Sequence, residues 1–152
     1  MCRREIYQHL RALQVRNRRE RWDFFNELFT HIVQAGEDRL PVLAGDWNAI
    51  LEEKDTTNHF HTKYCKVLAR LIKNMNYTDC FRHLHPGARE FTFHRGANIA
   101  QSRLDRVYLP PHLLQQLLSA QHRPGLGDHC LAEVELDPCQ AMPALYNSMR
   151  YV

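Results

Sequence analysis

A short apolar run that ends in a tight polar turn is the feature that most constrains the fold of this 152-residue chain. Residues 40–44, Leu-Pro-Val-Leu-Ala, predict a short buried strand. The following Gly45-Asp46-Trp47-Asn48 lets the backbone turn and presents two short polar side chains at the carboxyl end of that strand. Open α/β sheets place their chemistry at such strand ends, although the same pattern is also typical of an ordinary turn.

Length and composition are typical of one globular domain with a sizeable core, with 44% hydrophobic and 24% charged residues. No run approaches the roughly 20 apolar residues that span a bilayer, and no apolar segment of a signal peptide follows the basic start. We therefore expect a nuclear or cytoplasmic protein without a membrane partner. The five cysteines are scattered without a Cys-x-x-Cys pair, which argues against a disulfide framework and a cysteine zinc site.

The charge of the chain is unevenly distributed. A net charge of only +3 is not that of a strongly basic nucleic-acid-binding protein. Seven arginines nevertheless lie among the first 21 residues, where they could contact phosphates or form the solvated face of a helix.

Helical and strand periodicities alternate along the chain and predict an α/β fold with a mixed sheet flanked by helices. Polar residues 51–61 are expected to form a surface loop between two of these elements. One helix should bury a stripe composed of Trp22, Phe25, Phe29, Ile32 and Val33. The expected elements are, in order, helix 5–15, helix 18–35, strand 40–44, a helix capped by Thr62 and ended by Asn76, strand 90–94, strand 103–109, helix 110–118 and strand 130–136.

Five short polar side chains follow or begin predicted strands, namely Asp46, Asn48, Asp105, Asp128 and His129. If they converge, a carboxylate can orient a water or take its proton, and an amide can donate to a phosphoryl oxygen. A histidine held by a carboxylate can stabilise the negative charge that builds on that oxygen. Carboxylates gathered without cysteine suit Mg²⁺, which prefers oxygen ligands. The set predicts metal-assisted phosphodiester hydrolysis, with a purely structural role of the same residues as the alternative.

Three motifs carry a resemblance to a known family: 45–48, Ser-Arg-Leu-Asp at 102–105 and Gly-Asp-His at 127–129. Their order and spacing resemble the endonuclease/exonuclease/phosphatase family, which includes apurinic endonucleases and the endonuclease domains of LINE-type (non-LTR) retrotransposons. Two further segments resemble the retrotransposon branch of this family. They are residues 79–86 together with Phe91-Thr92-Phe93, and residues 19–25. The resemblance implies a four-layer α/β sandwich.

The resemblance also implies roles for the polar residues. Asp46 would orient or deprotonate the attacking water, and Asn48 would bind the scissile phosphate. Asp105 would hold His129, which would contact the phosphate and stabilise the transition state. The implied activity is that of a hydrolase, an endonuclease that cleaves DNA phosphodiesters with Mg²⁺ or Mn²⁺.

Three further residues are implied to assist. Thr92 matches a family threonine near the phosphate and would help to bind it, and Ser102 would help to fix the loop beside Asp105. Asp128 would lie at the metal site or support its ligands, although the usual metal-binding glutamate cannot be placed in this chain. Gly127 stands where the family usually has a serine.

These departures predict an N-terminally truncated domain. We expect a non-matching basic segment at 1–17, the C-terminal portion of the family domain at 18–137 and an irregular tail at 138–152. The inner face of the remaining sheet would then be exposed or covered by the N-terminal residues, and such a patch favours instability, self-association or pairing with a missing N-terminal half. Two other hypotheses are a non-catalytic retroelement remnant that at most binds nucleic acid or protein, and a phosphatase of small phosphorylated molecules.

Overall fold

The structure is a computed structural model, and it describes residues 18–36, 40–58, 65–96, 100–125 and 127–137. The predicted helix 5–15, the Thr62 helix cap and the tail 138–152 lie outside these described residues. No helix among the described residues is long and apolar enough to cross a membrane.

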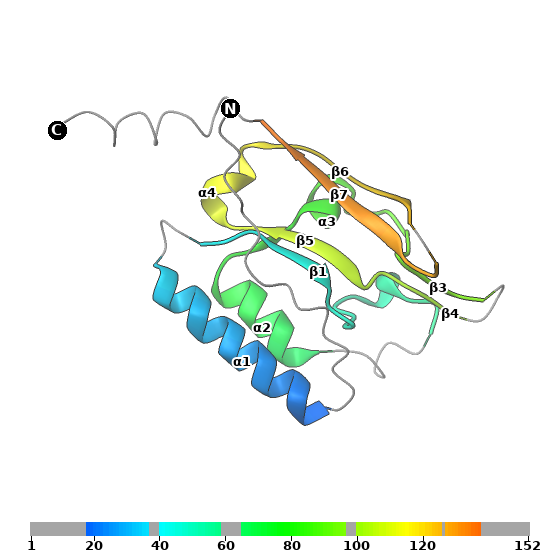
Figure 1. Cartoon of the computed structure of the whole chain (residues 1–152). Coiled ribbons are helices and arrows are strands. Elements are labelled where there is room, and N and C mark those ends of the chain that lie inside the picture. Colours follow the sequence, from blue (N-terminus) through cyan, green and yellow to red (C-terminus); the bar gives the residue numbers. More distant parts are fainter. Residues whose placement is uncertain (1–17, 37–39, 59–64, 97–99, 126, 138–152) are drawn as a thin grey trace.

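A three-stranded sheet with the order β1-β5-β2 forms the centre of the described fold (Figure 1). Its strands are β1 (Leu43–Asp46), β5 (Asp105–Leu109) and β2 (Thr78–Asp79). The predicted α/β class is confirmed, but both strand pairs of this sheet are antiparallel, whereas the sequence predicts a mixed sheet. Because antiparallel neighbours run in opposite directions, the end of β1 lies beside the start of β5. The two polar motifs that follow one strand and begin the other are therefore brought together.

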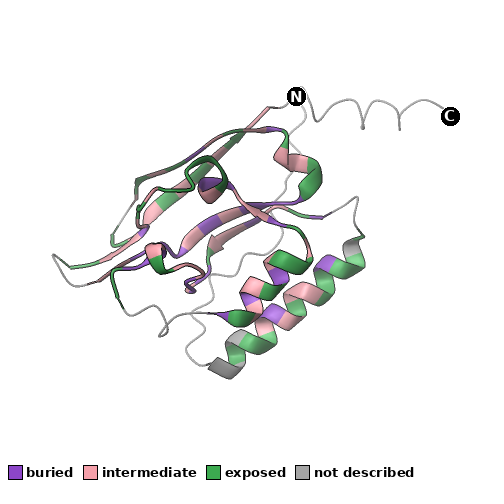
Figure 2. Ribbon diagram, turned by 180° about the vertical axis from the view of Figure 1, so that it is seen from behind, coloured by how far each residue is buried: buried purple, intermediate pink, exposed green. Residues whose placement is uncertain are grey.

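Helices α1 (Arg18–Ala35) and α2 (Lys66–Asn74) lie side by side against one face of this sheet (Figure 1). Phe25 is buried and stacks on Trp47, with ring centroids 6.2 Å apart. The predicted apolar stripe of α1 is too wide, because the side chains of Trp22 and Val33 are 57% and 52% exposed. A helix packed on a sheet buries only a narrow line of its surface, and here Phe25 and Ile32, two turns apart, form that line. Exposed residues run along the outer sides of both helices in Figure 2.

The other face of the sheet packs against a β-hairpin formed by β6 (Leu117–Pro124) and β7 (Cys130–Leu136), and against α3 (Cys80–Leu84). The predicted helix 110–118 is wrong beyond its first turn, since α4 spans only Pro111–Leu114 and β6 follows. Seven register pairs join β6 to β7, and this pairing overrides the helical pattern at the end of the predicted helix. The predicted strand 130–136 is confirmed.

Two short elements complete the described fold beside the sheet. Strands β3 (Phe93–Arg95) and β4 (Ala100–Ser102) form a second antiparallel pair. Strand β3 begins later in the chain and is shorter than the predicted strand 90–94. A 3-10 turn, η2 (Glu53–Asp55), lies in the segment that the sequence predicts as a polar surface loop. That prediction is wrong for Asp55 and Thr56, which are 0% and 3% exposed. Their burial has consequences for the candidate site.

Candidate active site

Asp46 and Asp105 are directly opposite each other across the β1–β5 pair. Asp46 ends β1 and is exposed, whereas Asp105 begins β5 and is half-buried. Side chains of opposed residues in an antiparallel pair lie about 5 Å apart at Cβ. The sheet register therefore places two carboxylates side by side at one end of the sheet.

The turn after Asp46 is fixed by Trp47, whose side chain is buried in the core between Phe25 and Tyr108. The Trp47 backbone N–H donates to the Leu104 carbonyl at 3.0 Å. Asn48 has a φ of +43°, in the left-handed region that Asn adopts more easily than most residues. Its backbone N–H donates to Asp46 Oδ1 at 2.8 Å, which closes the turn. The turn therefore keeps the backbone of Asn48 close to the Asp46 carboxylate.

His129 lies at the same end of the sheet. It immediately precedes β7, the second strand of the β6–β7 hairpin. Its Nδ1 lies 2.9 Å from Asp105 Oδ2, so the imidazole donates its Nδ1–H to the carboxylate. Partial burial lowers the pKa of His129, but the hydrogen bond and charge of Asp105, with the charges of Asp46 and Asp128, outweigh burial and raise it. An imidazole held in this way carries a positive charge more readily near neutral pH. Its ring is 34% exposed, so a ligand can reach it.

Thr92 lies behind the carboxylates rather than among them. Its side chain is 0% exposed, and its Oγ1 accepts the backbone N–H groups of both Leu104 and Asp105 at 2.9 Å. The predicted contact of Thr92 with a phosphate does not fit this geometry, because the hydroxyl is enclosed and already accepts two hydrogen bonds. Thr92 instead holds the backbone that carries Asp105.

Ser102 and Asp128 flank the same residues. Ser102 is buried, with its Oγ 3.1 Å from Thr56 Oγ1, two residues before Leu104. Asp128 is exposed, and its carbonyl accepts the backbone N–H of His94 at 2.9 Å. Of the residues predicted for the site, Asp46, Asn48, Asp105 and His129 gather at one surface, and we call these four the site cluster.

Comparisons with known proteins agree with this architecture. An AP endonuclease from Archaeoglobus fulgidus superposes with a TM-score of 0.64 at 18% identity, over 83% of this chain and 58% of that protein. The AP endonuclease LMAP from Leishmania major superposes with a TM-score of 0.58 at 17% identity, over 78% and 42% of the two chains. The chain has the AP-endonuclease fold. The predicted endonuclease/exonuclease/phosphatase-type architecture is thus confirmed.

One transposon protein is similar to this chain in sequence. The "Transposon TX1 uncharacterized 149 kDa protein" of Xenopus laevis is 27% identical over 128 residues, which make up 82% of this chain and 10% of that protein. No family model matches the sequence. The predicted resemblance to a retrotransposon endonuclease-like domain is confirmed by fold and relative together, and its LINE branch stays a prediction. The chain spans only a tenth of the transposon protein and 58% and 42% of the two solved structures.

The carboxylates of the site cluster and Asp128 are compatible in kind with Mg²⁺, because they offer oxygen ligands. Among the described residues, however, no group of three or more His, Cys, Asp or Glu side chains could hold a metal ion. Mg²⁺ is commonly bound by one or two carboxylates, with phosphate oxygens and waters completing its shell. Asp46 and Asp128 are the carboxylates near His129 that make no ion pair with described residues.

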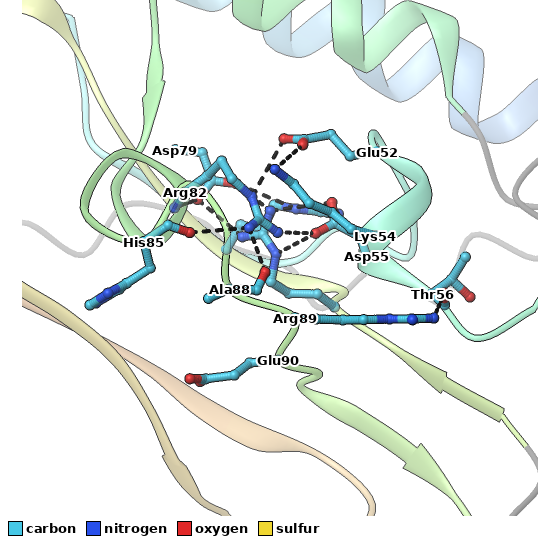
Figure 3. Close-up of polar contacts among 12 residues, drawn as sticks. Glu52, Lys54, Asp55, Thr56, Asp79, Arg82, His85, Ala88, Arg89 and Glu90 are labelled. Carbon is cyan, nitrogen blue, oxygen red and sulfur yellow. Dashed lines mark hydrogen bonds and ion pairs between the residues drawn. The ribbon is translucent and has the colours of Figure 1, made fainter.

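A second polar cluster, buried beside the site, has no counterpart in the sequence-based predictions. Asp55 Oδ1 lies 2.7 Å from Arg82 and 2.8 Å from Arg103, and its Oδ2 lies 3.2 Å from Arg106. Asp79 completes the group through Arg103 at 2.7 Å. Figure 3 shows Arg82 and Asp55 within the polar contacts that join residues 52–56 to α3 and the segment after it. We call these five residues the buried ion cluster.

Burial alone raises the pKa of the Asp55 carboxyl, but the hydrogen bonds and charges of Arg103, Arg106 and Arg82 outweigh it and lower this pKa to about 2. The carboxylate therefore stays ionised inside the protein, because it is paired on both oxygens. Arg82 and Arg103 belong to stretches that carry the family resemblance, yet neither stretch contains a sequence signal for the partner Asp55. The sequence around Asp55 shows only that a carboxylate precedes Thr56 and Thr57 in a polar segment.

Proposed function

We propose that this chain forms the acid–base side of a site that hydrolyses DNA phosphodiesters with the help of Mg²⁺ or Mn²⁺. The observation that carries the proposal is the 2.9 Å contact of Asp105 with His129, beside the exposed carboxylate of Asp46. A paired imidazole next to a solvent-facing carboxylate is suited to stabilise charge on a phosphoryl oxygen while a water is activated.

Each residue of the site cluster has a part in the proposed reaction. Asp46 uses Oδ1 to hold the Asn48 backbone, which leaves Oδ2 to orient the attacking water and take its proton. The Asn48 amide donates a hydrogen bond to a non-bridging oxygen of the phosphate. The water oxygen forms a new bond to phosphorus, and the bond to the leaving sugar oxygen breaks. His129, kept cationic by Asp105, donates to the oxygen on which negative charge increases.

A bound Mg²⁺ would supply further neutralisation of the phosphoryl charge, with Asp128 as its protein ligand. Asp128 keeps this role as a proposal because it is exposed and close enough to His129 to raise the pKa of that imidazole. Phosphate oxygens of the substrate would provide the remaining ligands.

DNA is favoured as the substrate by the proteins that share the fold and by the surroundings of the site. The two solved structures described above are AP endonucleases, and the sequence relative described with them is a transposon protein. The Phe93 ring lies 5.0 Å from the His129 ring, and exposed Arg95 follows two residues later on β3. An aromatic ring and a cation beside the reacting group are suited to bind a polynucleotide chain.

A second candidate is a non-catalytic domain that only binds nucleic acid or protein. The observation that favours it is the lack of a three-ligand metal group among the residues that the structure describes. In that case the site cluster would keep its geometry but would not accelerate hydrolysis.

Nicking of a supercoiled plasmid by the purified chain, with Mg²⁺ or Mn²⁺, distinguishes the two candidates. We expect nicking that EDTA abolishes and that falls by about 100-fold or more in Asp46→Asn, because this substitution removes the proton acceptor. Asp23→Asn is the matched control, since Asp23 is an exposed aspartate on α1. Equal nicking by wild type and Asp46→Asn would refute the proposal, and no nicking by folded wild type would favour the binding domain.

A further inference from the structure

The turn that carries Asp46 and Asn48 adopts a backbone conformation that needs support from outside. Asn48 lies in the left-handed region, which residues other than glycine seldom occupy. The hydrogen bond from its N–H to Asp46 Oδ1 is local to the turn and is exposed to water. A solvent-exposed local bond of this kind opens easily unless the flanking backbone is held.

Arg106 supplies that support from the buried side. Its Nη1 donates to the Ala49 carbonyl at 2.7 Å, immediately after Asn48. Its Nη2 donates to Asp55 Oδ2 at 3.2 Å, and the whole side chain is enclosed. Its backbone carbonyl accepts the indole N–H of Trp47 at 3.2 Å. One residue of β5 thus holds both sides of the turn.

The chemistry of this contact requires a guanidinium. Arg106 reaches a neutral carbonyl with one nitrogen and a carboxylate with another, and only the planar fork of arginine presents two donors in that fixed arrangement. The charge of Asp55 keeps the guanidinium in place, since an unpaired cation would not remain buried.

Arg103 provides a natural contrast within the same cluster. Its side chain is just as enclosed and binds both Asp55 and Asp79. None of its side-chain hydrogen bonds reaches residues 45–49. Arg103 and Arg106 therefore share the ion pairing but differ in contact with the turn.

We infer that Arg106, held by Asp55, is a positioning residue that fixes the Asp46–Asn48 turn against β5 and keeps Asp46 opposite Asp105. The inference rests on the proposed function only for its kinetic consequence. The geometric part concerns the folded chain whether or not it cleaves DNA.

Arg106→Lys tests the inference, with Arg103→Lys as the matched variant. Each substitution keeps a buried cation beside Asp55 but replaces the two-nitrogen planar fork, which spans the Ala49 carbonyl and Asp55 in Arg106, by one ammonium nitrogen. Amide hydrogen exchange of Asn48, followed by NMR, should accelerate by about 10-fold or more in Arg106→Lys and stay close to wild type in Arg103→Lys. The kcat of plasmid nicking should fall by about 100-fold in Arg106→Lys, with KM nearly unchanged, because the turn is displaced while the surface that binds DNA stays the same.

Equal acceleration of Asn48 exchange in the two variants would overturn the inference, because Arg106 would then act on stability alone. Selective acceleration in a chain that nicks no DNA would support the positioning role and refute the proposed function by itself. If Arg106→Lys does not fold, an NMR measurement on the wild-type chain tests the inference instead. An NMR contact between the guanidinium protons of Arg106 and the backbone of residues 49 and 50 supports the inference, and observed guanidinium protons without that contact overturn it.

Discussion

Asp105 and Arg106 are consecutive residues of β5, yet they belong to two polar clusters with opposite properties. Side chains of neighbouring strand residues point to opposite faces, so Asp105 joins the site cluster and Arg106 joins the buried ion cluster. The site cluster is partly exposed, and Asp46 and His129 retain hydrogen-bonding capacity for a ligand. In the buried ion cluster, Asp55 and Arg106 are 0% exposed and paired with opposite charges.

The difference in burial and pairing between the two clusters shows which polar residues are available to a substrate. A buried charge is tolerated only when its partners satisfy it, and a satisfied group has nothing left to offer a substrate. A half-exposed group can keep one side for its structural partner and the other for a ligand, as His129 does with Asp105 on one side and solvent on the other. The two clusters should therefore respond to substitution in different observables.

The largest effect on stability should come from the centre of the buried ion cluster. Asp55→Ala leaves three arginines without their shared carboxylate, so we expect the free energy of unfolding to fall by about 3–5 kcal/mol. Urea denaturation measures this change. Glu133→Ala is the control, because Glu133 is 45% exposed and pairs at 3.0 Å with the exposed Arg123, so its loss should cost less than about 1 kcal/mol. Similar losses in both variants would contradict the contrast between buried and exposed pairs.

Removing the hydroxyl of Thr92 should have an intermediate effect. Thr92→Val keeps the shape of the side chain but leaves the buried N–H groups of Leu104 and Asp105 without their acceptor, at a cost of about 2–3 kcal/mol. Thr92→Ser retains the hydroxyl and should keep more of the stability. Thermal unfolding compares the two variants, and a Thr92→Val protein as stable as Thr92→Ser would show that the two bonds are unimportant.

Acidification should weaken the buried ion cluster by a smaller amount. Because the arginines lower the pKa of Asp55 from 3.8 to about 2, its ionised form stabilises the fold above about pH 4, and that stabilisation is lost as the pH falls towards 2. A shift of this size corresponds to about 2 kcal/mol. The carboxyl carbon of Asp55, followed by NMR, should titrate near the lower value. A titration at the ordinary value of aspartate would mean that the arginines do not surround it in solution.

Sequence reasoning locates the parts of the site that depend on short, local patterns. Asp46 and Asp105 can be found because each adjoins an apolar run with the alternation or length of a strand. Their meeting point follows from the antiparallel register of β1 and β5, which the sequence patterns do not predict. Helix α1 has its predicted bounds for the same reason, since its periodicity is local.

Features that depend on distant partners could not be predicted in this way. The burial of Asp55 is decided by Arg82, Arg103 and Arg106, which lie 27 to 51 residues away in the chain. Strand β6 has a helix-like apolar spacing at its start, and only pairing with β7 makes it a strand. Thr92 has a recognisable neighbourhood in sequence, but its enclosed position depends on the packing of β3, β5 and β7. Such contacts join residues that are far apart in the chain, so neither local sequence patterns nor composition predict them.

The most direct test of the proposed site is plasmid nicking by His129→Gln, measured beside urea unfolding of the same preparation. We predict nicking reduced by about 100-fold or more, with a free energy of unfolding within about 1 kcal/mol of wild type, because His129 is partly exposed and its contribution is to the reaction. His83→Gln, at an exposed histidine of α3, should change neither quantity. Undiminished nicking by folded His129→Gln, or a loss of stability as large as that of Asp55→Ala, would contradict the division of roles between the two clusters.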